Sequence, residues 1–266
     1  MKNKLNTYEN KLLVLMSITF GLVFVDRMAL TYLSPYLIKD LGLNNAQLGM
    51  LVSGLSLTWA ISGYISTSWA EKHNKKKLVF VGAVILFSLS SISSALATTF
   101  TILLITRLLM GLSEGPTLPL IQSFIAKESS KNRIGFNMGF LQSFGSTLFG
   151  FMLAPVLLVL LAEKFGWRSA FLIAGIPGII MAFVNWKFLR KSTVENTQKS
   201  EDKSLSFKEL LKYRNMRIGI LISCCMMTWL NCNIAFLPKY FIEKQHITEG
   251  EIGAIMGLMG LSSLLS

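Results

Sequence analysis

Charged side chains lie inside two apolar stretches of this sequence, and their types suit them to proton and anion chemistry. The stretch RLLMGLSEGPTLP, residues 107–119, carries Arg107 and Glu114, and an earlier apolar stretch carries the adjacent pair Asp26 and Arg27. A carboxylate takes up and releases a proton, whereas a guanidinium binds carboxylates and phosphates. Together these side chains have the chemistry to couple a proton to an anion.

Charges within apolar stretches are costly and require partners. Each charge at the middle of a bilayer costs about 2.5–3.5 kcal/mol on the translocon scale, so these groups must face one another or a wet cavity. Glu114 follows Arg107 by two helical turns on the same face, and at about 1.5 Å per residue Asp26 lies at a depth similar to that of Arg107. One interpretation is a central cavity in which the arginines bind an anion and the carboxylates exchange protons. The other is a set of salt bridges that only hold helices together.

The rest of the composition indicates the elements that position these residues. Of the 266 residues, 52% are hydrophobic and 15% are charged, whereas a soluble domain has about a quarter of its residues charged. The hydrophobic residues come in runs of about 20, the length of a bilayer-spanning helix. We therefore predict an all-α integral membrane protein. The predicted spans are residues 12–33, 46–70, 78–98, 100–126, 134–161, 169–189 and 217–242, with an eighth begun near residue 251.

The distribution of basic residues predicts the orientation in the membrane. Most lysines and arginines outside the spans fall on the same side as the amino terminus. The opposite side holds only Lys39, Lys164, Arg168, Lys239 and Lys244. The positive-inside rule then places the amino terminus in the cytoplasm of a multi-pass protein of the cytoplasmic (plasma) membrane. The net charge of +12 is explained by this topology, so a nucleic-acid partner is not expected.

A polar stretch divides the chain into predicted units. Residues 1–189 form a six-helix transmembrane bundle, residues 190–216 a cytoplasmic linker, and residues 217–266 the start of a second bundle. Within the linker, Ser206 and Glu209 fit a capping box, which predicts a short amphipathic helix beginning near Ser206; a flexible linker is the alternative. The sequence stops at Ser266 within a hydrophobic run, so we expect a fragment or a truncated product.

Enzymatic chemistry is not supported by the residue pattern. His73 and His246 lie on opposite predicted sides of the membrane, and no nucleophile–base pair occurs within the spans. The three cysteines have no metal-site spacing. We therefore expect no enzyme activity, no cofactor and no metal.

The loop after the second predicted span resembles a signature of the major facilitator superfamily. It reads GYISTSWAEKHNKKKLV, in which an acid and a base precede a turn and more bases. In this sequence Glu71 replaces the usual Asp, and Asn74 stands where Gly is usual; Asn is the next best residue for a left-handed turn. The resemblance implies a loop that gates the rocking of two bundles. Its residues here are Gly63, Glu71, Lys72, Lys75 and Lys76.

Three further stretches together resemble the anion:cation symporter branch of that superfamily, which includes sugar-acid, phthalate and sialic-acid transporters. They are VDR in the first span, RLLMGLSEGPTLP in the fourth and GWRSAFLIAGIPG opening the sixth. The resemblance covers essentially the whole chain as the first two-thirds of a twelve-helix protein. It implies a major facilitator fold, with a six-helix N-terminal bundle and the start of a second bundle that ends in the eighth helix.

The same resemblance implies roles for individual residues. Asp26 and Glu114 match positions of proton-coupling acids, and Arg27 and Arg107 match positions in or near the anion site. Trp59 and Gln142 align with substrate-contacting positions.

The sequence thus predicts a monomeric secondary transporter that imports a small organic anion, a sugar acid or similar carboxylate, together with protons. Its partners are the anion, protons and the lipid bilayer. Two alternatives stay open. One is an efflux or facilitator-type protein of the same superfamily, and the other is a truncated membrane protein that does not transport.

Overall fold

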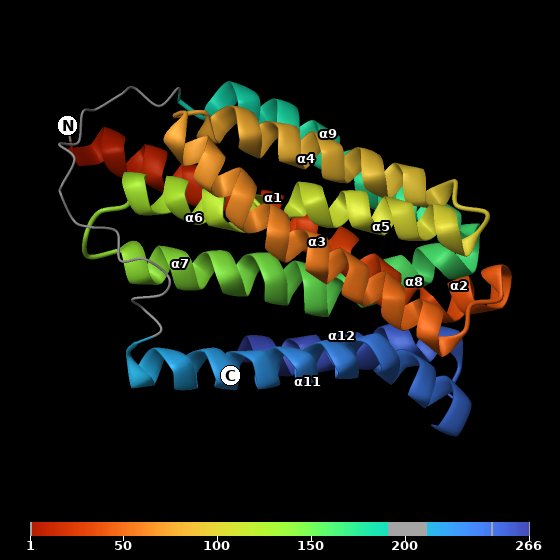
Figure 1. Ribbon diagram of the computed structural model, residues 1–266. Coiled ribbons are helices and arrows are strands. Elements are labelled where there is room, and N and C mark those ends of the chain that lie inside the picture. Colours follow the sequence, from red (N-terminus) through yellow and green to blue (C-terminus); the bar gives the residue numbers. More distant parts are fainter. Residues whose placement is uncertain (1, 191–211, 246, 266) are drawn as a thin grey trace.

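The computed structural model describes residues 2–190, 212–245 and 247–265, and within these ranges the regular structure is entirely helical (Figure 1). The elements are α1 Lys2–Tyr32, α2 Ser34–Leu41, α3 Asn45–Lys72, α4 Lys76–Ala95, α5 Phe100–Glu114, α6 Thr117–Glu128, α7 Ile134–Gln142, the π-helix η1 Ser143–Leu153, α8 Ala154–Phe165, α9 Trp167–Phe188, α11 Arg214–Gln245 and α12 Glu249–Leu265. The amphipathic helix expected near Ser206 lies outside the described residues.

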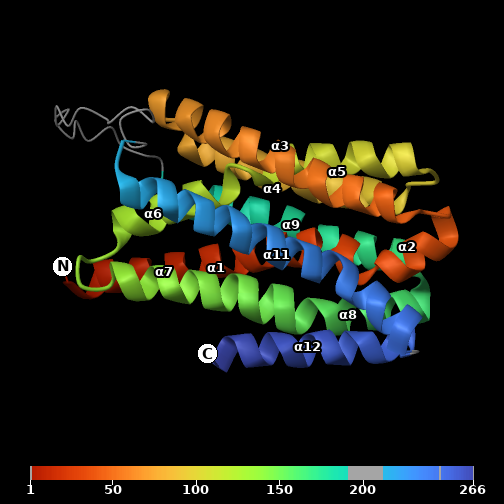
Figure 2. The same ribbon diagram turned by 60° about the horizontal axis from the view of Figure 1, so that its bottom comes forward.

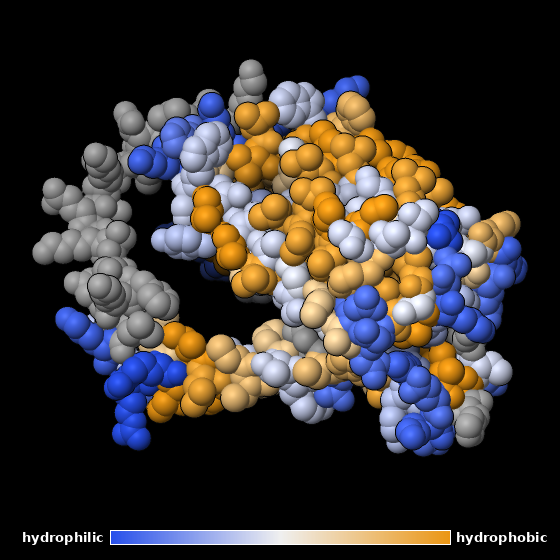
Figure 3. Space-filling view, turned by 45° about the vertical axis from the view of Figure 1, so that its right-hand side comes forward, coloured by the Kyte–Doolittle hydropathy of each residue, from blue (hydrophilic) through white to orange (hydrophobic). Residues whose placement is uncertain are grey.

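Five of the predicted spans, residues 12–33, 46–70, 78–98, 134–161 and 169–189, correspond to long apolar helices. Within the residues that the structure describes, five helical stretches are long and apolar enough to cross a membrane: Tyr8–Tyr32, Asn45–Lys72, Lys76–Ala95, Ile134–Phe165 and Trp167–Phe188. Figures 1 and 2 show that they run side by side along a common direction, with α11 and α12 on one side of the bundle. The face drawn in Figure 3 is largely hydrophobic, with hydrophilic side chains gathered toward its ends, as a bilayer requires.

The fourth predicted span is broken rather than continuous. Its two halves, α5 and α6, meet at Gly115 and Pro116, directly after Glu114. Gly115 packs against α3 so closely that a Cβ there would lie 2.5 Å from the backbone nitrogen of Gly63 and 2.6 Å from the carbonyl oxygen of Trp59. The glycines therefore allow α3 and α5 to approach closely, and the break places Glu114 at the end of a helix inside the bundle.

The fifth predicted span contains a long π-helical segment that the sequence did not indicate. Between α7 and α8, η1 carries Gly145 and Gly150, which approach α1. A Cβ at Gly145 would lie 2.5 Å from the Phe20 ring, and the Tyr32 hydroxyl donates a hydrogen bond of 3.2 Å to the Gly150 carbonyl. A π-helix within an α-helix is often found at functional sites.

A short helix, α2, extends the first span at its far end. Pro35 occupies its first turn, and Gly42 ends it with φ 61°. Asp40 on α2 accepts hydrogen bonds from Trp167 Nε1 at 3.1 Å and Arg168 Nη1 at 2.6 Å, at the start of α9. This cluster joins the ends of α2 and α9.

Two apolar clusters fill the bundle at different depths. One contains Tyr32, Leu33, Leu103 and Phe171, and the other contains Met16, Phe80, Phe87 and Ile121. Along α1, Asp26 falls between the residues of the two clusters. Arg107 and Glu114 fall between the cluster residues of α5 and those of α6. The charged residues therefore occupy a layer between the two apolar clusters.

The helices after the linker contact the bundle unevenly. Leu237, Phe241 and Ile242 of α11 pack against the cluster that contains Tyr32, and Lys239 donates a hydrogen bond to Asn45 at the start of α3. The beginning of α11, residues 214–229, is exposed, and Figure 3 shows an opening between this side of the molecule and the bundle. Meanwhile α12 lies along α8, where a Cβ at Gly253 would lie 3.1 Å from the Pro155 carbonyl oxygen.

Candidate substrate and proton site

The four charged residues singled out in the sequence lie in two groups between α1, α3, α4 and α5. Asp26 and Arg107 are fully buried and Glu114 is 2% exposed. Arg27 is the most accessible, with 20% of its side chain exposed. Since charged side chains are almost never fully buried without partners, the contacts of each determine what the site can do.

The first group joins Glu114, Arg27 and Trp59. A carboxylate oxygen of Glu114 lies 3.8 Å from Nη1 of Arg27, and the Arg27 guanidinium lies 5.0 Å from the centre of the Trp59 ring. Neither oxygen of Glu114 accepts a hydrogen bond from a described residue. A separation of 3.8 Å gives attraction without a hydrogen bond, so Glu114 retains its full capacity to accept one.

The second group centres on Asp26 and α4. Ser91 donates a hydrogen bond to one oxygen of Asp26, and the other oxygen has no hydrogen-bond partner among the described residues. The Ser91 hydroxyl also lies 3.4 Å from the carbonyl oxygen of Phe171 on α9. Through Ser91, Asp26 on α1 is therefore linked to α4 and α9, and one of its oxygens has no donor among the described residues.

Arg107 belongs to the same layer but has no carboxylate partner at close range. Its Nη2 donates to the Ser94 hydroxyl at 2.7 Å, its Nη1 lies 3.3 Å from the Met110 sulfur, and its guanidinium lies 5.0 Å from the centre of the Phe171 ring. Its Nε has no hydrogen-bond partner in the described part of the chain. Within the described residues no carboxylate oxygen lies within 4 Å of it, although Asp26 and Glu114 are near enough to act on it electrostatically.

Two serines of α4 that complete this layer were missed in the sequence. Ser91 and Ser94 contact Asp26 and Arg107 respectively, and both are buried. The serine-rich stretch SLSSISS could have identified them, because Ser88, Ser91 and Ser94 recur every third residue along one helix face. A polar face on an apolar helix indicates a polar partner inside the bundle.

Gln142 is not brought together with the charged residues. It is exposed at the junction of α7 and η1, and its side chain donates to the Ser146 hydroxyl at 3.1 Å. No contact of its side chain with the four charges is seen in the described part of the chain. Trp59, by contrast, lies beside Arg27.

The loop with the superfamily signature adopts the expected turn. Asn74 has φ 53°, the left-handed conformation that Gly would occupy. Glu71 and Lys76 form an ion pair of 2.9 Å, and Lys76 donates to Ser123 on α6 at 2.7 Å. Gly63 packs on Gly115 as described above, and Lys72 and Lys75 are exposed.

A further buried acid, Glu9, lies near the amino-terminal end of α1. The sequence placed it outside the first span, so it was not identified. It accepts a 2.8 Å hydrogen bond from Asn137 and lies 3.9 Å from Nε of Arg133. These contacts connect α1 to the start of α7, and they involve none of the four central charges.

Metal binding has no support in the described residues, where no group of three or more His, Cys, Asp or Glu residues is placed to hold an ion. The fold and the site instead define a class of protein. Charges and interrupted helices at mid-bundle in a multi-pass helical protein are typical of membrane transporters.

The family follows from sequence comparison. The sequence model of the Major Facilitator Superfamily matches residues 15–266, and the chain belongs to that superfamily. This confirms the fold expected from the sequence.

Similar proteins differ in their described activities. The hexuronate transporter of Bacillus subtilis is 29% identical over 254 residues, covering 90% of this chain and 60% of that protein. The quinolone resistance protein NorA of Staphylococcus aureus is 30% identical over 200 residues, covering 74% of this chain and 50% of that protein. The chain thus spans about half to three-fifths of the curated relatives it matches.

Solved structures share the fold at low sequence identity. An inward-facing, unoccupied bacterial homologue of the human lysosomal transporter Spinster has a TM-score of 0.77 at 19% identity, over 97% of this chain and 61% of that one. The nucleoside transporter NupG has a TM-score of 0.75 at 18% identity, over 96% of this chain and 65% of that one.

Proposed function

We propose that the protein is a secondary transporter that imports a small organic anion, such as a sugar acid, together with protons. The observation that carries this proposal is the layer of buried charges with unused bonding capacity. Arg107 has no carboxylate within 4 Å in the described residues, while Asp26 and Glu114 retain oxygens without hydrogen bonds. Salt bridges that only hold helices together would use that capacity within the protein.

Arg27 and Arg107 would bind the anion. A guanidinium presents several donors in a plane and suits a carboxylate better than an ammonium does. Arg27 is partly exposed and sits 3.8 Å from Glu114, so an entering carboxylate can compete with Glu114 for it. Trp59 beside Arg27 offers an apolar face to the rest of the substrate, as is common in small-molecule sites.

Asp26 and Glu114 would carry the protons. If the substrate takes Arg27, Glu114 remains in a buried position without its cation, which is unfavourable unless a proton binds. Importing one monoanion against an inside-negative membrane potential of about 100 mV costs about 2.3 kcal/mol. One proton imported with the anion cancels this cost, and a second adds driving force. Substrate binding and protonation would therefore support each other.

Alternating access would expose the layer to each side in turn by rocking of the two bundles. One end of α11 contacts α2 and α3, whereas its beginning is exposed. This arrangement fits a state that is open toward the amino-terminal side. In this proposal that side is the cytoplasm, the protein acts as a monomer, and the loop of Gly63, Glu71, Lys72, Lys75 and Lys76 gates the movement. The division into units 1–189, 190–216 and 217–266 is part of the same proposal.

Uptake of a charged sugar and its neutral counterpart tests the proposal. Proteoliposomes containing the product of the complete gene would be given an inward proton gradient and labelled glucuronate or glucose. Accumulation of glucuronate but not glucose, lost when the gradient is collapsed, is the expected result. Equal handling of the two sugars, or uptake that ignores the gradient, would contradict the proposal.

Similarity to a quinolone resistance protein supports a second candidate, export of a drug-like compound. Cells expressing the complete gene would then hold less of a fluorescent quinolone than control cells. Lower quinolone content together with no glucuronate uptake would favour export.

A further inference from the structure

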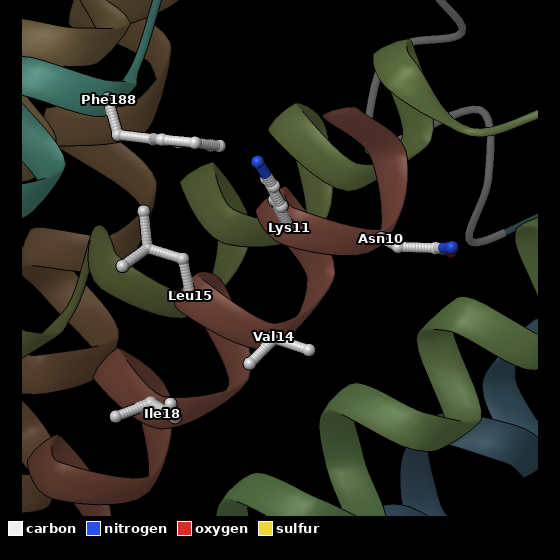
Figure 4. Close-up of a pocket in the computed structure, with 6 residues that line it drawn as sticks. All are labelled: Asn10, Lys11, Val14, Leu15, Ile18 and Phe188. Atoms are coloured by element: carbon white, nitrogen blue, oxygen red, sulfur yellow. The ribbon is translucent and has the colours of Figure 1, made fainter. Parts of the chain in front are cut away.

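A shallow groove lies on α1, away from the layer of charges (Figure 4). It is lined by Asn10, Lys11, Val14, Leu15, Ile18 and Phe188. Figure 4 shows Lys11 and Phe188 pointing toward each other across its upper end, with Leu15 and Ile18 below them. The lower part of the groove is therefore apolar, whereas its upper end carries a positive charge.

A second cation lies beside the same end. The Arg190 guanidinium lies 4.1 Å from the centre of the Tyr8 ring, and that ring stacks on Phe188 at 5.2 Å. Both Lys11 and Arg190 are exposed, and in the part of the chain that the structure describes neither has a carboxylate oxygen within 4 Å. Lys11 therefore lines the apolar groove, and Arg190 is connected to its Phe188 end through the Tyr8 ring; among the described residues neither cation has an acidic partner.

Neighbouring residues place the groove near the level of the lipid head groups if the chain lies in a bilayer as its apolar helices indicate. Trp186, half exposed, is on α9 one turn from Arg190, and the amino group of Lys77 lies 5.2 Å from the centre of its ring. Tryptophan and lysine concentrate at the boundary between the hydrocarbon and head-group regions. From Lys11 to Ile18, α1 descends about two turns into the hydrocarbon.

We propose that this groove binds one anionic phospholipid, with its phosphate between Lys11 and Arg190 and an acyl chain along Val14, Leu15 and Ile18. The inference uses the amino-terminal orientation proposed above, which places the groove in the cytoplasmic leaflet. That leaflet carries the anionic lipids, and basic pockets between helices on that side bind anionic head groups. A second copy of the chain would bring the same two cations against this face, so charge favours the lipid.

Competition between lipids tests the head-group contacts. The product of the complete gene would be purified in detergent with equal amounts of phosphatidylglycerol and phosphatidylcholine, and bound lipid counted by native mass spectrometry. We expect retained phosphatidylglycerol in the parent, about fivefold less with Lys11→Gln or Arg190→Gln, and retention in Arg190→Lys. Lys127→Gln and Lys131→Gln, exposed cations elsewhere at this end, serve as matched controls. Equal losses in all the glutamine variants would overturn the proposal in favour of diffuse surface charge.

A photoreactive side chain identifies the occupant directly. Val14, which is 46% exposed, would be replaced by p-benzoylphenylalanine. As a control, the same residue would replace Phe183, which is 67% exposed on α9 and does not line the groove. In membranes of both lipids, we expect adducts of phosphatidylglycerol to be enriched at position 14 and adducts at position 183 to follow the bulk composition. Adducts at position 14 with residues 191–211, with a second chain, or with lipids in bulk proportion would each overturn the proposal. None of these outcomes depends on transport activity. The proposed transport function can therefore be disproved without disproving lipid binding in the groove.

Discussion

The Glu114 carboxylate lies 3.8 Å from the Arg27 guanidinium, yet it accepts no hydrogen bond from any described residue. Glu114 is 2% exposed, whereas Arg27 keeps 20% of its side chain accessible. The acid is thus enclosed and its counter-ion can be reached from outside. Such a pair is loose enough to be separated by a competing anion.

Removing the charge of one member of the Arg27–Glu114 pair should lower the free energy of unfolding more than removing both charges. Arg27→Gln leaves a buried carboxylate without its cation, which we expect to lower the free energy of unfolding by about 1–3 kcal/mol. The double variant Arg27→Gln/Glu114→Gln removes both charges and should recover most of that loss. Thermal unfolding in detergent measures both. An additive loss in the double variant would show that the two residues do not interact.

The close packing of α3 on α5 predicts sensitivity to a single methyl group. Gly115→Ala places a Cβ 2.5 Å from the Gly63 nitrogen, so the helices must separate; overpacking of this kind costs about 1–3 kcal/mol. Gly82→Ala on α4, where a Cβ meets nothing within 4 Å, is the control. Unfolding temperatures of the two variants should differ by several degrees. If Gly115→Ala melts with the parent, the two helices are not in close contact there.

The turn at Asn74 predicts a dependence on backbone conformation. With φ 53°, a leucine at this position is strained by about 1–2 kcal/mol, whereas glycine is not. Asn74→Leu should therefore lower the unfolding temperature and Asn74→Gly should leave it unchanged or raise it. The two variants together separate backbone strain from loss of the Asn side chain, since both lack it. Equal effects would exclude strain as the cause.

The cluster at the ends of α2 and α9 predicts a pH-dependent contribution to stability. Hydrogen bonds from Arg168 and Trp167 lower the pKa of Asp40 below its ordinary value. A lowered pKa in the folded state means that the stabilisation is present above the ordinary aspartate pKa of about 3.9 and is lost as the pH falls through the folded value. Asp40→Asn should therefore melt below the parent near neutral pH, and the difference should shrink in acid.

The control for this experiment is Glu163→Gln, an exposed acid at the end of α8. Its unfolding temperature should follow the parent at every pH. A gap between Asp40→Asn and the parent that stays constant into acid would show that the Asp40 charge is not what stabilises the cluster.

The long helices, and the presence of four charged residues within the apolar stretches, could be predicted from the sequence for identifiable reasons. A run of about 20 apolar residues has few structures available in a bilayer, and an ionisable residue within it must have a partner. The interruption beside Glu114 falls at Gly115 and Pro116, between α5 and α6. The pairing of each arginine with a particular acid could not be predicted from the sequence, because it depends on how each helix is rotated about its own axis. Arg27 turned out to approach Glu114, while Arg107 contacts serine, methionine and a phenylalanine ring.

Other features left weak signals or none. The π-helix η1 has the same apolar composition as an α-helix, so its hydrogen-bond register is not visible in the sequence. Serines in membrane helices commonly bond to their own backbone, as Ser88 does to the Val84 carbonyl. The contacts of Ser91 and Ser94 with charged groups were hidden among such cases. Glu9 was missed because it precedes the first predicted apolar residues, although α1 begins earlier, at Lys2.

Proton movement caused by the substrate tests the central claim most directly. Cells expressing the complete gene would be suspended in weak buffer with a pH electrode outside, and sugar acids, aromatic acids and sialic acid would be added one at a time. The account predicts alkalinisation with at least one of these acids, abolished in Glu114→Gln and retained in Glu163→Gln, while Glu114→Gln still exchanges labelled substrate. An unchanged pH across the panel with the protein present in the membrane, or full accumulation by Glu114→Gln, would contradict it.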